Sequence, residues 1–185
     1  MKRFIVVEGP DNAGKSTLIK LLVNEGITEL KFPKRTSDGL FKIESANDFA
    51  IFETLLDELA PGTYVIDRFL ISNMVYEGIR GGTNSQRYID KFHELNSKYN
   101  FTWVMLTRNK IGVDFDDDNI SLSKTTFNSI IDSYSNYCKV LGLRESQYLK
   151  HNLMNEVIHC SDFLLHDIKD RLTEPLIWMM NESNE

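Results

Sequence analysis

Short apolar runs alternate along the chain with longer stretches in which apolar and polar residues recur at helical spacing. Apolar runs of this length are typical of strands buried on both faces. They occupy residues 4–7, 64–66, 101–106 and 157–158, and a weaker run at 28–32 is stopped by Pro33. Such alternation predicts an α/β fold, with a doubly wound, mostly parallel sheet of five strands flanked by helices.

The stretches between the runs predict the helices. Apolar stripes at helical spacing cover residues 15–24, 49–59, 69–77, 84–98, 125–141 and 161–172. From residue 109 to 124 the periodicity disappears and aspartates accumulate, which favours a mobile loop. We expect one domain over residues 1–185, with this loop as its lid, although a run of aspartates is most often a solvated face.

A glycine-rich loop directly follows the first apolar run. Residues 9–17 read Gly-Pro-Asp-Asn-Ala-Gly-Lys-Ser-Thr and fit the phosphate-loop pattern Gly-x-x-x-x-Gly-Lys-[Ser/Thr]. Backbone N–H groups of such a loop, with the start of the next helix, surround phosphate oxygens. We expect ATP at this loop, with these contacts: Gly9, Asn12, Ala13, Gly14, Lys15, Ser16 and Thr17. The alternative is an ordinary strand-to-helix turn.

Two roles within the loop follow from chemistry. Lys15 would reach the β and γ phosphates, and Ser16 would offer its hydroxyl to Mg²⁺. Asp67 follows the run at 64–66, and its carboxylate could hold a water of the same ion.

Arginines follow two of the predicted strands. Arg68 stands beside Asp67, and its planar guanidinium suits bidentate capture of a second phosphate. Arg35 lies in Phe-Pro-Lys-Arg-Thr at residues 32–36 and would bring another guanidinium to the same edge. The alternatives are that Asp67 and Arg68 pair locally or cap a helix, and that Arg35 belongs to a solvated basic turn.

Together these stretches resemble the thymidylate kinases, which phosphorylate dTMP with ATP. The resemblance is carried by residues 8–17, 32–35 and 67–76, which occur in the order and at the spacing of the family. It implies the P-loop fold of nucleoside monophosphate kinases, ATP and Mg²⁺ as donor and cofactor, and a homodimer.

The resemblance also implies a role for individual residues. Lys15, Arg68 and Asp11 would be catalytic, and Asp11 would also contact the 3′-hydroxyl of the acceptor. The deoxynucleoside monophosphate (dNMP) would be held by Arg35 and Arg68. Tyr76 would disfavour a 2′-hydroxyl, and Asn73 would face the base. The remaining contacts would be Phe32 and Phe49 for the dNMP and Cys160 for the adenine.

Two departures from the family leave alternatives open. Residues 44–60 contain no arginine to bind the base, so Phe49 or Phe52 could stack on it while Glu44 or Asp48 accepts from an amine of guanine or cytosine. The acceptor could therefore be dTMP, dGMP, dCMP or a modified pyrimidine. Residue 12 is asparagine where the family can place a catalytic arginine, and Arg108 or Arg144 could replace it.

Composition and short motifs argue against several other classes of function. A net charge of −6 argues against broad nucleic-acid binding, which needs a basic surface. The start of the chain reads as neither signal peptide nor membrane span, and both cysteines read as reduced thiols, so we expect a cytoplasmic location. A deoxynucleoside kinase or a non-catalytic nucleotide-binding protein stays open. A GTPase-like switch is disfavoured because Asn109 and Lys110 lack the aspartate of a guanine-reading motif.

Overall fold

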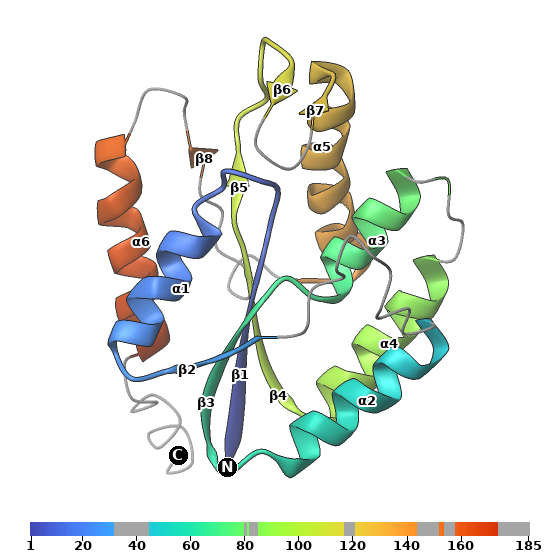
Figure 1. The fold of residues 1–185 in the computed structure, drawn as a ribbon, viewed down its shortest axis with the longest axis vertical. Helices are drawn as coiled ribbons and strands as arrows, with labels where there is room; N and C mark the ends of the chain where they lie inside the picture. The colour runs from blue at the N-terminus through green and yellow to red at the C-terminus, as the bar shows by residue number, and fades with distance from the viewer. Residues whose placement is uncertain are drawn as a thin grey trace, which may run out of the picture.

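A computed structural model describes residues 1–31, 45–79, 81, 85–116, 121–143, 152–153 and 158–173 of the chain. Within these residues a central sheet separates two layers of helices (Figure 1). None of the helices in the described ranges combines the length and the apolar character needed to cross a bilayer.

The central sheet has four parallel strands in the order β2-β3-β1-β4. They are β1 (Lys2–Glu8), β2 (Thr28–Leu30), β3 (Gly62–Asp67) and β4 (Asn100–Met105). Along β1, Phe4 and Val6 pack on one face, and Ile5 and Val7 pack on the other. Because both faces are covered, the strand is apolar at consecutive positions, as the sequence predicts.

Six helices flank this sheet in the described part of the chain: α1 (Lys15–Asn24), α2 (Ser45–Glu58), α3 (Leu70–Ile79), α4 (Ser85–Lys98), α5 (Lys124–Val140) and α6 (Ile158–Thr173). The helices α1 and α6 cover the face of Ile5 and Val7, and α2 to α5 pack on the other (Figure 1). The prediction of a doubly wound α/β fold is therefore confirmed.

The strand expected at residues 157–158 is wrong at Ile158, which is the first residue of α6, and Val157 lies outside the described residues. A two-residue apolar run cannot distinguish a strand from a helix. Instead, β8 (Asn152–Leu153) pairs in parallel with β5 (Thr107–Arg108), which continues the chain just beyond β4. The main sheet thus has four described strands where five were expected.

The loop expected at residues 109–124 contains regular structure. Its described part includes β6 (Phe115–Asp116) and β7 (Ser121–Leu122), which pair antiparallel. Phe115 is buried and stacks on Phe127 of α5 with ring centroids 4.1 Å apart. An apolar anchor at a position without helical periodicity explains why the pattern missed this pair. The role of the segment as a lid stays a prediction.

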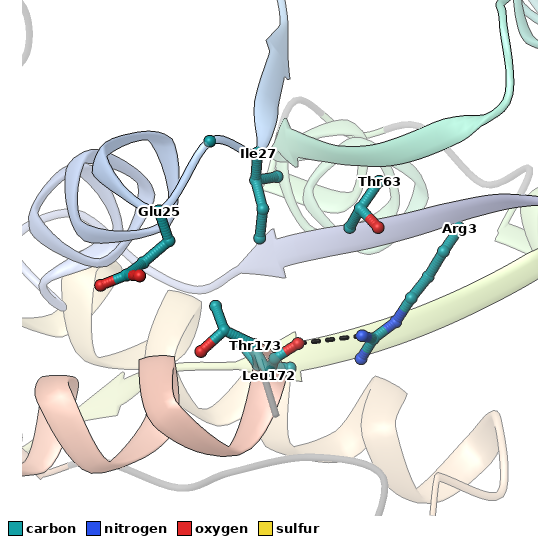
Figure 2. A pocket seen from close by; sticks show the side chains of 7 residues that line it. Arg3, Glu25, Ile27, Thr63, Leu172 and Thr173 are labelled. Atoms are coloured by element: carbon teal, nitrogen blue, oxygen red, sulfur yellow. Dashed lines mark hydrogen bonds between the residues drawn. The ribbon is translucent and has the colours of Figure 1, made fainter. Parts of the chain in front are cut away.

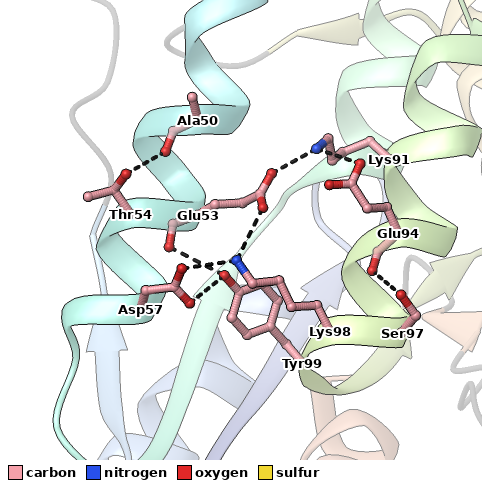
Figure 3. Close-up of polar contacts among 9 residues, drawn as sticks. All are labelled: Ala50, Glu53, Thr54, Asp57, Lys91, Glu94, Ser97, Lys98 and Tyr99. Atoms are coloured by element: carbon pink, nitrogen blue, oxygen red, sulfur yellow. Dashed lines mark hydrogen bonds and ion pairs between the residues drawn. The ribbon is translucent and has the colours of Figure 1, made fainter.

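Polar contacts join α2 to the end of α4 (Figure 3). Lys91 pairs with Glu53 at 2.7 Å, and Lys98 pairs with Asp57 at 2.9 Å. The Tyr99 hydroxyl donates to the same Asp57 carboxylate at 2.7 Å. Because α2 and α4 precede parallel strands, their N-terminal turns lie at the edge of the sheet where the strands end.

The opposite edge of the sheet contains a cavity of about 290 Å³ (Figure 2). Arg3 at the start of β1 crosses this cavity, and its guanidinium donates to the carbonyl of Leu172 in α6 at 2.9 Å. This contact ties the beginning of the chain to its last described helix.

Candidate functional site

The candidate site begins at the loop between β1 and α1. Gly9 has φ +144°, and a Cβ there would stand 2.2 Å from the carbonyl oxygen of Leu106, which leaves space only for hydrogen. Gly14 has φ 86° in the left-handed region and is the N-cap of α1. The backbone therefore requires glycine at the two positions that define the sequence motif.

Lys15 lies inside the loop, and 6% of the residue is exposed. Its ammonium group donates to the carbonyl of Pro10 at 2.7 Å. Burial lowers the pKa of Lys15 to about 8, and the positive charge of Arg68 acts in the same direction. The carboxylates of Asp11, Asp67 and Glu8 oppose this shift. The structure thus places a cation within the loop, in the electrostatic field of Arg68.

Three side chains from separate segments meet beside Lys15, and we call them the Asp11–Arg68–Tyr76 cluster. The guanidinium of Arg68 forms an ion pair with the carboxylate of Asp11. The Tyr76 hydroxyl donates to the other oxygen of that carboxylate at 3.2 Å, and the Arg68 guanidinium lies 3.5 Å from the hydroxyl. The side chains of Arg68 and Asp11 remain 31% and 26% exposed, so solvent reaches the cluster.

The charges of the cluster are fixed by its surroundings. Burial alone would lower the pKa of Arg68, but the interactions with Tyr76, Tyr134 and Asp11 outweigh it and raise that pKa. Burial raises the pKa of Tyr76 to about 12. Arg68 is therefore a permanent cation, and Tyr76 is a neutral hydrogen-bonding group near neutral pH.

Arg68 is held by the backbone around it. Its φ of 62° lies in the left-handed region, and its N–H donates to the carbonyl of Val7 at 3.0 Å. Such a conformation costs an arginine about 1–2 kcal/mol relative to the right-handed one. The cost is tolerated where the surrounding structure overdetermines the chain.

Glu8 supplies much of that support. Its buried carboxylate accepts from the backbone N–H groups of Phe69 at 2.8 Å, Ile71 at 3.1 Å and Ser72 at 3.2 Å, and from the Ser72 hydroxyl. Burial raises the pKa of Glu8, and these hydrogen bonds oppose the increase. Glu8 therefore caps α3 and fixes the chain just after Arg68. The only sequence signal for this role is an acidic residue at the end of an apolar strand.

A second arginine approaches the backbone of Asp11. Arg108 in β5 is 8% exposed, and its guanidinium approaches the backbone carbonyl of Asp11 at 3.5 Å. The same guanidinium stands over the ring of Phe127, 5.4 Å from its centroid. Burial lowers the pKa of Arg108.

The remaining expected contacts are placed only in part. Phe32 and Arg35 lie outside the described residues, and so does the side chain of Cys160. Asn73 is exposed on α3, one turn before Tyr76. Phe49 in α2 is half-buried, and the guanidinium of Arg87 from α4 stands 4.8 Å from its ring centroid. This arginine comes from another helix, so the sequence of residues 44–60 does not indicate it.

The expected Mg²⁺ ligands are suitable by type. Ser16 and Asp67 are exposed and offer a hydroxyl and a carboxylate, the hard oxygen donors that Mg²⁺ prefers. The charge of Asp67 acts on Lys15, which places it near the loop. Among the described residues no group of three or more histidine, cysteine or acidic side chains is arranged to hold a metal ion.

No model of a known protein family matches the sequence, and no curated protein matches it either. Several solved structures are similar to the structure of this chain. The YorR protein of Bacillus subtilis, solved in complex with phosphorylated GDP, is 22% identical with a TM-score of 0.59, over 91% of this chain and 95% of YorR.

Two thymidylate kinases are also similar in structure. The enzyme of Ehrlichia chaffeensis is 15% identical with a TM-score of 0.53, over 92% of this chain and 97% of the enzyme. That of Candida albicans is 18% identical with a TM-score of 0.53, over 99% and 92% of the two chains. The chain therefore has the fold that these thymidylate kinases share with YorR.

Proposed function

We propose that this chain is an ATP-dependent kinase of deoxynucleoside monophosphates, with dTMP as the leading acceptor. The observation that carries the proposal is the Asp11–Arg68–Tyr76 cluster beside the buried Lys15. One cation lies in a loop suited to a triphosphate, and a second lies where another anion could meet it. The shared fold with thymidylate kinases supports this reading.

On the donor side, the backbone N–H groups of residues 9–14 and the ammonium of Lys15 would hold the phosphates of ATP. Ser16 and Asp67 would hold Mg²⁺, which neutralises charge on the β and γ phosphates when it is bound. Since the pKa of Lys15 is lowered to about 8 in the free protein, bound phosphate would stabilise its charged form.

On the acceptor side, Arg68 would bind the monophosphate with its guanidinium. An oxygen of that monophosphate would attack the γ-phosphorus of ATP. The bond from this phosphorus to the bridging oxygen would break, and ADP would leave with the electron pair. The chain's contribution is positioning and charge stabilisation, without a covalent intermediate.

Tyr76 would select the sugar. A 2′-hydroxyl against its ring would lack a partner, which disfavours a ribonucleotide by about 1–3 kcal/mol. Asp11 would shift from pairing only with Arg68 and Tyr76 to accepting also from the 3′-hydroxyl.

The test is a coupled assay for ADP with ATP, Mg²⁺ and each dNMP and NMP in turn. We expect turnover with at least one dNMP and a preference of about tenfold or more for it over its ribose counterpart. Folded protein that phosphorylates none of them would contradict the proposal.

Arg68→Ala separates a monophosphate kinase from a deoxynucleoside kinase. If the acceptor is a monophosphate, the variant should lose about 100-fold or more in kcat/KM, because a phosphate contact is removed. A free nucleoside acceptor would keep its activity. Arg171→Ala, an exposed arginine of α6 paired with Asp167 at 3.0 Å, is the matched control.

A guanine deoxynucleotide is the second candidate acceptor. YorR was solved with phosphorylated GDP, and it shares the fold of this chain. The same assay distinguishes the candidates by the ratio of kcat/KM for dGMP and dTMP. The homodimer and the cytoplasmic location expected from the sequence also stay predictions, and sedimentation equilibrium tests the first.

A further inference from the structure

A chain of hydrogen bonds runs through the core near Arg68. The Glu8 carboxylate accepts from the Ser72 hydroxyl, and this hydroxyl lies 2.8 Å from the hydroxyl of Tyr134 in α5. Glu8, Ser72 and Tyr134 are all buried. Each of these polar groups therefore depends on its protein partners, and the direction of every hydrogen bond in the chain matters.

The donors of this chain can be assigned by counting protons. Three backbone N–H groups and the Ser72 hydroxyl donate to Glu8, which favours its carboxylate form. A serine has one hydroxyl proton, and Ser72 donates it to Glu8. The Ser72 oxygen must then accept from Tyr134, whose hydroxyl keeps its proton because burial raises the pKa of Tyr134 well above its usual value. Both hydroxyl groups thus direct their protons toward Glu8.

Tyr134, at the far end of this chain, acts on Arg68. Burial lowers the pKa of Arg68, but Tyr134 is among the groups that raise it. A hydroxyl oxygen whose proton is donated elsewhere still has lone pairs, which a neighbouring cation attracts. Tyr134 is fully buried, whereas the Asp11 side chain is 26% exposed, so Arg68 interacts with Tyr134 on the core side and with Asp11 on the solvent side. Tyr134 therefore supports the side of Arg68 that an acceptor would leave unoccupied.

We propose that Tyr134 is a positioning residue of the proposed kinase reaction, which holds the Arg68 guanidinium in the orientation that binds the acceptor monophosphate. The inference rests on the proposed function and deepens it. The ion pair of Arg68 with Asp11 reaches solvent, where such pairs contribute little to the fixing of a side chain. A core hydroxyl that is itself fixed through Ser72 and Glu8 orients the guanidinium before the substrate arrives, which lowers the entropic cost of binding.

The experiment compares Tyr134→Phe with the wild-type protein in steady-state kinetics for ATP and the accepted dNMP. The substitution keeps the ring in the core and removes only the hydroxyl. We expect KM for the dNMP to rise about tenfold, with kcat and KM for ATP within about twofold of wild type. Tyr64→Phe is the matched control, because Tyr64 is also buried and its hydroxyl donates to the carbonyl of Ala60 at 2.8 Å, near the start of β3. The control should keep both KM values.

A double-mutant cycle distinguishes positioning of Arg68 from a general loss of packing. If Tyr134 acts through Arg68, Tyr134→Phe should change kcat/KM for the dNMP by less than about twofold in an Arg68→Ala background. An effect of the same size in both backgrounds would overturn the inference, and so would a wild-type KM for the dNMP in folded Tyr134→Phe.

If Tyr134→Phe fails to fold, Ser72→Ala decides the question, because it breaks the chain between Glu8 and Tyr134 but keeps both groups. A KM for the dNMP raised about threefold or more would support the inference, and a wild-type KM would overturn it. Wild-type protein that phosphorylates no dNMP would instead refute the proposed function itself, whereas an active wild type with unchanged KM in the variants would refute this inference alone.

Discussion

Single residues of the phosphate loop are constrained by space and by charge. Gly9 is limited by the carbonyl of Leu106 and by its own φ, so both packing and backbone conformation exclude a side chain. At Lys15 the charged form is destabilised, because the ammonium is buried and lies in the field of the Arg68 cation. These two constraints lead to separate predictions about stability.

Gly9→Ala should reduce the free energy of unfolding by about 3 kcal/mol, as the sum of a close contact and an unfavourable φ. Urea denaturation measures the loss. Gly26→Ala is the matched control, because Gly26 has φ +85° but no atom within 4 Å of an added Cβ. This control should lose only about 1 kcal/mol. Equal losses in the two variants would show that the contact with Leu106 contributes nothing.

Lys15 should make stability depend on pH in a defined direction. Its pKa is about 8 in the folded protein and 10.5 for an unperturbed lysine side chain. Between these values the unfolded chain binds the proton more strongly, so the free energy of unfolding rises with pH. The rise amounts to a few kcal/mol, on the order of 1.4 kcal/mol per unit of pKa.

The measurement is urea denaturation of the wild-type protein and Lys15→Met from pH 7 to 10. The unfolding free energy of the wild type minus that of Lys15→Met should increase as pH increases. A difference that is constant over this range would contradict the buried, destabilised charge.

At the scale of elements, α3 depends on a residue of another element. Its first N–H groups are satisfied by the Glu8 carboxylate at the end of β1. The Ser72 hydroxyl adds a contact and in turn bonds the Tyr134 hydroxyl of α5 at 2.8 Å. Strand β1 and the helices α3 and α5 are thus linked by one buried polar network, which fixes where Arg68 and Tyr76 point.

Glu8→Gln should therefore weaken both the helix and the cluster. Replacing the carboxylate puts an amide donor against backbone donors, which should cost about 2 kcal/mol in unfolding free energy. Hydrogen exchange of the Phe69, Ile71 and Ser72 amides should accelerate more than that of α1. Glu25→Gln, which removes only an exposed pair with Lys169, should change stability by less than about 1 kcal/mol. Unchanged exchange at α3 would refute the capping role.

Apolar periodicity predicts the helices well, because the helices are 10 to 17 residues long and each turn adds an apolar position to the stripe. Periodicity does not predict Ile158 as helical, nor the two-residue strands β6 and β7, because a run of two residues is too short to show a period. The phosphate loop and Arg68 could be predicted because their signals are local. The role of Glu8 depends on partners 61 to 64 residues away, and no local pattern contains that information.

At the scale of the whole molecule, the sheet separates two apolar clusters. The smaller one, between the sheet and the helices α1 and α6, includes Ile168 and Leu172. The contact of Arg3 with the Leu172 carbonyl lies beside it. The last described helix therefore completes the core that supports the phosphate loop through α1.

Leu172→Ala should accordingly destabilise the whole domain. Truncating a leucine that is 5% exposed should cost about 3 kcal/mol, and unfolding should stay a single transition. Tryptophan fluorescence and far-ultraviolet circular dichroism in urea report on the two faces together. Val140→Ala, at a side chain that is 59% exposed, should change stability by about 0.5 kcal/mol or less. Separate transitions for the two probes would show that the clusters fold independently.

The left-handed backbone at Arg68 has an evolutionary consequence. Glycine or asparagine would relax the chain at this position, so selection for stability alone would replace the arginine over time. Chains of this fold that retain arginine there do so despite the free-energy cost of its left-handed backbone. Retention would mark the lineages in which the guanidinium is needed, and drift to glycine would mark those in which the acceptor chemistry has been lost.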